Sequence, residues 1–372
     1  MEPVELVSRW LGIEKLYFTK IEGCCPTSIP LNEVVFTYRW FTDEDKQHIG
    51  VDFWELFGKG KEVLEHKLEE LKQGKKVEEP EDIKVALETF DYIMDASKRL
   101  SEKDIEAVTD DLSDYHREID SNVVIAREFI SPLLGPKGII VLNSRHASSS
   151  ELHAKEPSKL RVASAAGTWR GLGIGHPCAW HGEVDMMVVP NNAIPSGVTA
   201  VLVQPVTDNV QDEDVCDSAG CRLIEGKQDS SDMGLGFSQA IATAITSSFA
   251  YKPQYSYEGT LFPTIQVSRS GFEIFLYDSE TDVLLMNTFQ WLPTTIVYLW
   301  AVLYYHLLLT TTTKSSDSFK CSYRRLSDEF GGLTRFEGRT KFAVPIANIS
   351  HKQKHITDVL FRSEGGKRKH VP

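Results

Sequence analysis

Glu225 and Lys227 form a charged pair whose spacing could support chemistry. They lie in the apolar-flanked segment CRLIEGKQ, residues 221–228, which the sequence pattern predicts to be a strand. Residues i and i+2 of a strand project from the same side, so this carboxylate and this ammonium would lie next to each other. Such a pair is either surface decoration or half of an active site.

Three further polar residues occupy predicted core elements. Asp185 stands near the start of the predicted strand EVDMMVVP, residues 183–190. Glu128 lies in the otherwise apolar predicted helix VVIAREFISPLL, and Gln239 opens the predicted helix that follows the Glu225–Lys227 segment. Together with Glu225 and Lys227, these residues make up the candidate site.

The chemistry that suits this set is metal-dependent hydrolysis of a phosphodiester. Burying unpaired carboxylates is costly, and converging carboxylates are usually neutralised by a cation. Their hard oxygens favour Mg²⁺ or Mn²⁺, which polarises a phosphate and lowers the pKa of a bound water. Asp185 and Glu225 are the expected metal ligands, with Glu128 as a further one. Lys227 would lie toward the nucleophile and stabilise developing charge.

The order of these residues resembles the PD-(D/E)XK nuclease superfamily, over residues 120–310 or so. An acidic helix comes first, then an aspartate on a strand, then Glu-x-Lys on a later strand, then a helix with a glutamine. The resemblance implies a mixed central sheet flanked by helices, a restriction-endonuclease-like core and magnesium-dependent cleavage of nucleic acid. It matches Glu128 to the helix acid, Asp185 and Glu225 to the two strand acids, Lys227 to the catalytic lysine and Gln239 to the helix glutamine.

The chain departs from the family pattern at two points. Val184 replaces the proline before the aspartate, which many members also lack, and a strand and an acidic loop separate Asp185 from Glu225. The segment QPV at 204–206 is a competing position for Glu-x-Lys, and it lacks both charges. That alternative gives an inactive nuclease-like protein that works by binding or as a scaffold. We favour 225–227 because it keeps both charges and directly precedes the glutamine helix.

The elements that must position these residues follow from the apolar periodicity. The predicted strands are 138–143, 183–190, 198–206, 221–228 and three more between 260 and 289, and the predicted helices are 121–135, 238–250 and 296–309. This order indicates an α/β or α+β core with a mixed sheet. The segment 296–309 is shorter than the ~20 residues that span a bilayer, so we expect a buried core helix.

The flanking regions are predicted to differ from this core. Residues 1–120 are expected to be mostly helical, with helices over 61–74 and 82–100 and a third that begins at Ser101 as N-cap. The core domain is expected over 121–312, followed by a polar linker and tail over 313–372. The N-terminal helices could provide a recognition arm or a homodimer interface.

Composition limits the classes of function. The formal net charge of −13 argues against a broad cationic surface for non-specific nucleic-acid binding, although a local basic groove stays open. The six cysteines are irregularly spaced, which predicts no disulfide framework and a reducing compartment. The first residues do not have the pattern of a signal peptide. We expect an intracellular protein, cytoplasmic or nuclear, with DNA or RNA as its partner and no membrane association.

Two other motifs have competing interpretations. His176, Cys178 and His181 in GHPCAWHG could ligate zinc, but no second pair with matching spacing stands out. A segment that lines the approach to Asp185, with Trp180 and His181 near the substrate, is favoured over zinc, and simple packing is favoured over both. The basic KRKH at 367–370 is either a nuclear address or a soluble tail, and the second is favoured.

Overall fold

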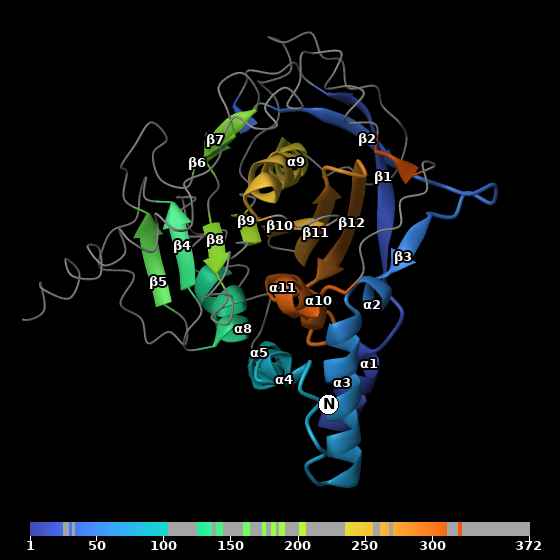
Figure 1. Ribbon diagram of the computed structural model, residues 1–372, viewed down its shortest axis with the longest axis vertical. Helices are drawn as coiled ribbons and strands as arrows, with labels where there is room; N and C mark the ends of the chain where they lie inside the picture. The colour runs from blue at the N-terminus through green and yellow to red at the C-terminus, as the bar shows by residue number, and fades with distance from the viewer. Residues whose placement is uncertain are drawn as a thin grey trace, which may run out of the picture.

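The fold is built on one large, curled β-sheet, seen in the computed structural model (Figure 1). From one edge to the other the sheet contains β2 (Phe36–Trp40), β1 (Lys15–Cys24), β12 (Val283–Gln290), β11 (Gly271–Asp278), β10 (Phe262–Val267), β9 (Val201–Pro205), β8 (Met186–Val189), β4 (Ile139–Asn143) and β5 (Lys159–Ala163), with β3 (Gly50–Asp52) paired to β1. The pairs β9–β10 and β4–β5 are parallel, and the other pairs are antiparallel. The predicted mixed sheet flanked by helices is therefore confirmed.

The structure describes most of the N-terminal third and the elements of the core. The described residues are 1–24, 30–31, 34–102, 125–135, 139–143, 159–163, 173–175, 180–183, 186–189, 201–205, 235–255, 261–267, 271–310 and 319–321. The predicted strand 221–228 and nearly all of the predicted tail, 313–372, lie outside them.

The predicted strands that fall on described residues are confirmed. The segment 138–143 forms β4, 198–206 forms β9, and the three runs between 260 and 289 form β10, β11 and β12. The segment 183–190 contributes to two strands, the end of β7 (His181–Glu183) and β8, on either side of residues 184–185. β7 pairs with β6 (Gly173–Gly175) in a separate small sheet. Long apolar runs thus located the central strands correctly.

The helix predicted over 82–100 is divided in two. α4 (Lys84–Leu87) and α5 (Phe90–Glu102) are separated by a turn at Thr89. The Thr89 hydroxyl donates to the carbonyl of Ala86 at 2.7 Å, and the indole of Trp300 donates to the same hydroxyl at 3.0 Å. The break is therefore held by a long-range contact that local periodicity does not reveal.

The ends of the neighbouring helices test two capping predictions. α3 (Gly58–Gln73) ends at Gly74, whose φ of 63° is the left-handed conformation that glycine adopts easily, as expected. The prediction that Ser101 caps a new helix is wrong. Ser101 lies in the last described turn of α5, where its hydroxyl donates to the carbonyl of Lys98 at 2.8 Å.

Two apolar helical segments are buried, as the sequence predicts. The first consists of the π-helical turn η2 (Ala126–Ile130) and α8 (Ser131–Leu134), and it ends at Gly135 with a φ of 64°. The second consists of α10 (Ile296–Leu303) and α11 (Tyr305–Leu308), joined at the buried Tyr304. Within the described part of the chain, no helix combines the length and apolar character needed to cross a membrane.

One side of the sheet packs against α10, α11 and the N-terminal helices. Tyr298 of α10 lies between Phe53 of α2 (Phe53–Leu56) and Phe289 of β12, with ring centroids 4.8 Å apart in both pairs. The hydroxyl of Tyr304 donates to the carbonyl of Leu133 at 3.1 Å and so links these helices to α8. On this side, one hydrophobic cluster contains side chains from Leu6 to Leu308.

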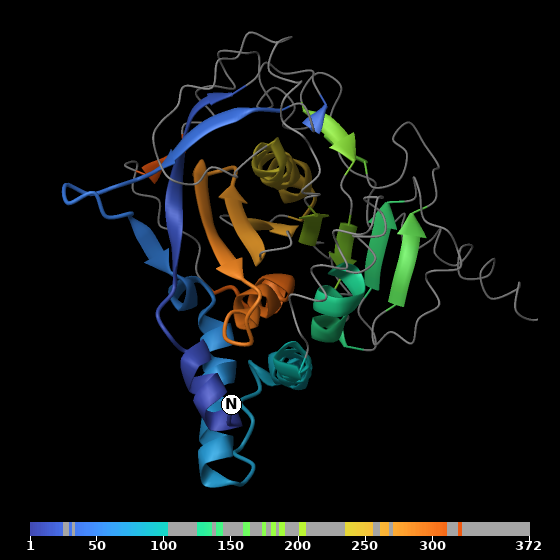
Figure 2. The same ribbon diagram turned by 180° about the vertical axis from the view of Figure 1, so that it is seen from behind.

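The other side of the sheet is covered by α9 (Leu235–Tyr255). Phe237 of α9 packs against Phe275 of β11, with ring centroids 5.0 Å apart. The backbone N–H of Phe36 in β2 donates to the hydroxyl of Ser238 at 3.1 Å. Figures 1 and 2 show β1 and β2 arching over α9, with the β6–β7 hairpin beside it. The helix is thus enclosed by the curl of the sheet.

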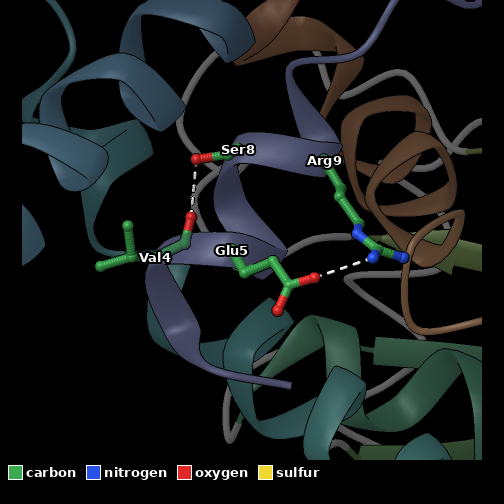
Figure 3. A network of polar contacts seen from close by, with 4 residues as sticks. All are labelled: Val4, Glu5, Ser8 and Arg9. Atoms are coloured by element: carbon green, nitrogen blue, oxygen red, sulfur yellow. Dashed lines mark hydrogen bonds and ion pairs between the residues drawn. The ribbon is translucent and has the colours of Figure 1, made fainter.

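The first helix, α1 (Pro3–Trp10), is anchored by burial rather than by its surface contacts. Figure 3 shows two contacts along its exposed side, the Ser8 hydroxyl donating to the Val4 carbonyl and an ion pair between Arg9 and Glu5, each at 2.7 Å. Exposed pairs of this kind contribute only a few tenths of a kcal/mol. Trp10 is fully buried and holds the end of the helix in the core. We assign no function to this network.

Candidate functional site

Three of the five predicted site residues lie outside the described residues. These are Asp185, Glu225 and Lys227. Asp185 directly precedes β8, whereas Glu225 and Lys227 fall between β9 and α9 along the chain. Their assignment as metal ligands and catalytic lysine stays a prediction.

The structure describes the other two, Glu128 and Gln239. Glu128 lies on η2, where its Oε1 accepts a hydrogen bond from Nε of Arg127 at 2.8 Å and its side chain is only 18% exposed. Gln239 lies in the first turns of α9 and is half-buried. Among the described residues no group of three or more His, Cys, Asp or Glu side chains could hold a metal ion. Any metal site of the predicted kind must therefore include residues outside this set.

The strands next to Asp185 have a defined register. Met186, the first residue of β8, pairs with Val203 of β9. The next residue of β9, Gln204, pairs with Gln266 of β10, and Gln266 pairs in turn with Glu273 of β11. Directly paired residues lie side by side on one face of a sheet. A row of polar residues therefore crosses three adjacent strands, one position along β9 from the pair that Met186 forms with Val203.

Glu273 is the polar residue that the sequence analysis missed. It lies in the strand GFEIFLYD, whose other residues, including Asp278 at its end, are all buried. Burial raises the pKa of Glu273 to about 7. Its Oε2 is shielded from solvent and has no hydrogen-bond partner among the described residues. The signal for it in the sequence is an acid inside the apolar run FEIFLY of a central strand.

Two neighbours on β10 share this lack of partners. Gln266 is 5% exposed and Thr264 is fully buried. Within the described structure, neither Oε1 of Gln266 nor Oγ1 of Thr264 has a hydrogen-bond partner. Thr264 and Gln266 are two residues apart on one strand, so they project to the same side as Glu273. We call Thr264, Gln266 and Glu273 the buried polar triad.

Tyr38 of β2 lies near Glu273, one member of the triad. Its ring stacks on Phe237 of α9, with centroids 5.0 Å apart, and Phe237 contacts Phe275 in turn. Burial raises the pKa of the Tyr38 phenol well above its usual value, and the nearby carboxylate of Glu273 raises it further. The phenol therefore stays protonated and can donate a hydrogen bond.

The atoms of the buried polar triad that have no partner among the described residues are all oxygens. A carboxylate, an amide oxygen and a hydroxyl are the groups that hard cations and hydrogen-bond donors prefer.

Comparison of the chain with family models, with curated proteins and with solved structures finds no match.

Proposed function

We propose that this protein is a metal-dependent nuclease with a PD-(D/E)XK-like core. The observation that carries the proposal is the order of the described elements. Along the chain, η2 with Glu128 precedes β4, β8 begins directly after Asp185, β9 follows, and α9 carries Gln239. The helix α9 then leads to β10, which pairs in parallel with β9 in the same sheet. This is the succession of acidic helix, strands and glutamine helix that the resemblance implies.

The predicted donor set suits the proposed metal. Carboxylates of Asp185, Glu225 and Glu128 are hard oxygen donors, which fit Mg²⁺ or Mn²⁺. When bound, such an ion would polarise the scissile phosphate and lower the pKa of the attacking water. Lys227 would orient that water and stabilise the negative charge that develops on the phosphate. Gln239 would support the site or contact the nucleic acid.

A second candidate is a protein with the same core that binds nucleic acid without cleaving it. Two observations favour it. β9 is bonded to both β8 and β10, so it is the strand next to Asp185, and its sequence VLVQP has no acid and no lysine. The carboxylate of Glu128 is already engaged by Arg127. If the functional strand is β9 rather than 221–228, the catalytic charges are absent.

The deciding experiment is cleavage of labelled single- and double-stranded DNA and RNA with Mg²⁺ or Mn²⁺. Asp185→Ala and Lys227→Ala should each lower the rate by about 100-fold or more. The exposed Glu62→Ala and Lys72→Ala on α3 are the matched controls and should cleave like the wild type. Cleavage that survives both site substitutions would show that the assignment is wrong. Binding without any cleavage would establish the second candidate.

A further inference from the structure

The buried polar triad contains oxygen atoms that the described contacts leave without hydrogen-bond donors or a compensating positive charge. Among the described residues, Oε2 of Glu273, Oε1 of Gln266 and Oγ1 of Thr264 find no hydrogen-bond partner, and all three are shielded from solvent. A buried acceptor without a donor costs about 1–3 kcal/mol, and a buried charge costs more. Three such atoms on one side of two adjacent strands point to a missing partner.

The register brings these atoms to one place. Gln266 and Glu273 are directly paired across β10 and β11, and Thr264 lies two residues before Gln266 on the same side. Directly opposite side chains start about 5 Å apart, and diagonal neighbours lie within reach of long side chains. The side chains of Glu273 and Gln266 are long enough to bring their oxygens to one point beside the Thr264 hydroxyl.

The three unpartnered atoms are oxygens, so the missing partner must supply positive charge or hydrogen-bond donors. A water would satisfy some of the acceptors, but it would leave the charge of an ionised Glu273 uncompensated. A bulky organic cation does not fit against atoms that have almost no exposed surface. A small, hard cation meets both conditions, because it takes carboxylate, amide and hydroxyl oxygens as ligands.

We propose that Glu273, Gln266 and Thr264 form a divalent-cation site, for Mg²⁺ or Mn²⁺, between α9 and the sheet. Glu273 supplies the charged ligand and the other two supply neutral oxygens, with water completing the coordination. The site goes beyond the proposed nuclease function, because none of the three belongs to the predicted catalytic set. It does not depend on that function, since cation binding is measured without substrate.

The test is calorimetric titration of Mn²⁺ into the metal-free full chain, checked by electron paramagnetic resonance of the bound ion. Glu273→Gln keeps the shape of the side chain but removes its charge, and it should weaken one binding event at least about tenfold. Thr264→Val keeps the volume but removes the hydroxyl, and it should weaken the same event. Glu62→Gln, on the exposed side of α3, is the matched control and should bind like the wild type.

An Asp185→Asn variant separates this site from the predicted nuclease metal. If the proposal holds, Asp185→Asn retains the binding event that Glu273→Gln loses. Wild-type protein that binds no Mn²⁺ overturns the proposal. So does Mn²⁺ binding that is unchanged in both Glu273→Gln and Thr264→Val, whatever Asp185→Asn does. Circular dichroism of each variant confirms that it is folded before titration.

Discussion

The metal-free wild-type protein should become less stable as the pH rises, and the variant Glu273→Gln should not. Burial raises the pKa of Glu273 from 4.5 to about 7. The folded protein therefore holds this proton over a pH range in which the unfolded chain has already released it. Below pH 4.5 the carboxyl is neutral in both states, and its contribution is fully present. The contribution is lost as the pH rises through the folded-state pKa.

The magnitude follows from the difference between the two pKa values. A difference of about 2.5 corresponds to about 3 kcal/mol of unfolding free energy. Between pH 4.5 and 8 the wild type should lose about this much stability relative to Glu273→Gln, which cannot ionise there. This is a large part of the 5–15 kcal/mol or so that separates folded from unfolded states in typical domains.

The assay is urea unfolding in EDTA at pH 4.5, 6, 7 and 8, followed by tryptophan fluorescence. EDTA keeps divalent cations from competing with the proton. Comparing two proteins at each pH cancels the titration of all other groups. Glu62→Gln, exposed on α3, should follow the wild type. Parallel pH profiles for the wild type and Glu273→Gln would refute the reasoning, because they would mean that the carboxyl ionises without cost.

Three further predictions concern burial, backbone conformation and a buried polar contact. Burial lowers the pKa of His306 to about 4, so its contribution to stability is present above pH 6.5 and is lost as the pH falls toward 4. His306→Gln should remove this loss of about 3 kcal/mol in the free energy of unfolding at acid pH, as measured by urea unfolding. Gly135→Ala should destabilise the protein by about 3 kcal/mol or more, because Gly135 has a positive φ and an added Cβ would clash with the ring of Tyr92. Gly74→Ala, where an added Cβ would contact nothing, should cost only about 1 kcal/mol. Equal melting temperatures of the two variants would contradict this prediction. Cys321→Ala should lower the stability measured by thermal melting by about 1–2 kcal/mol, because the Cys321 thiol donates to the buried carboxylate of Asp282 at 3.1 Å. An unchanged melting temperature would show that this contact is dispensable.

The sequence predicted the central strands because their burial is continuous. β10 and β11 are strings of buried residues, and such runs indicate strands without knowledge of their neighbours. β2 was missed although it alternates buried and exposed residues, because its aromatic-rich surroundings obscure the alternation. The pairing of β1 with β12 is beyond any local pattern, since more than two hundred residues separate the two strands.

The candidate site was predicted less well than the fold. Glu128 and Gln239 lie on helices as expected, whereas Asp185, Glu225 and Lys227 lie outside the described residues, so their convergence stays a prediction. Glu273 was missed because a single glutamate in a strand usually points to solvent. Its burial depends on the placement of α9 and on the central position of β11, and both are consequences of tertiary structure.

The β1–β12 pairing determines how this protein can be shortened and how it folds. A fragment that starts at residue 121 would leave β12 as an exposed, largely apolar edge, which invites pairing with other chains and aggregation. It would also remove Trp10 and Phe53 from the shared core. During synthesis β1 emerges long before its partner, and the entropy of closing so long a loop makes this contact a late step of folding. β1 and β12 thus have to be kept in one polypeptide.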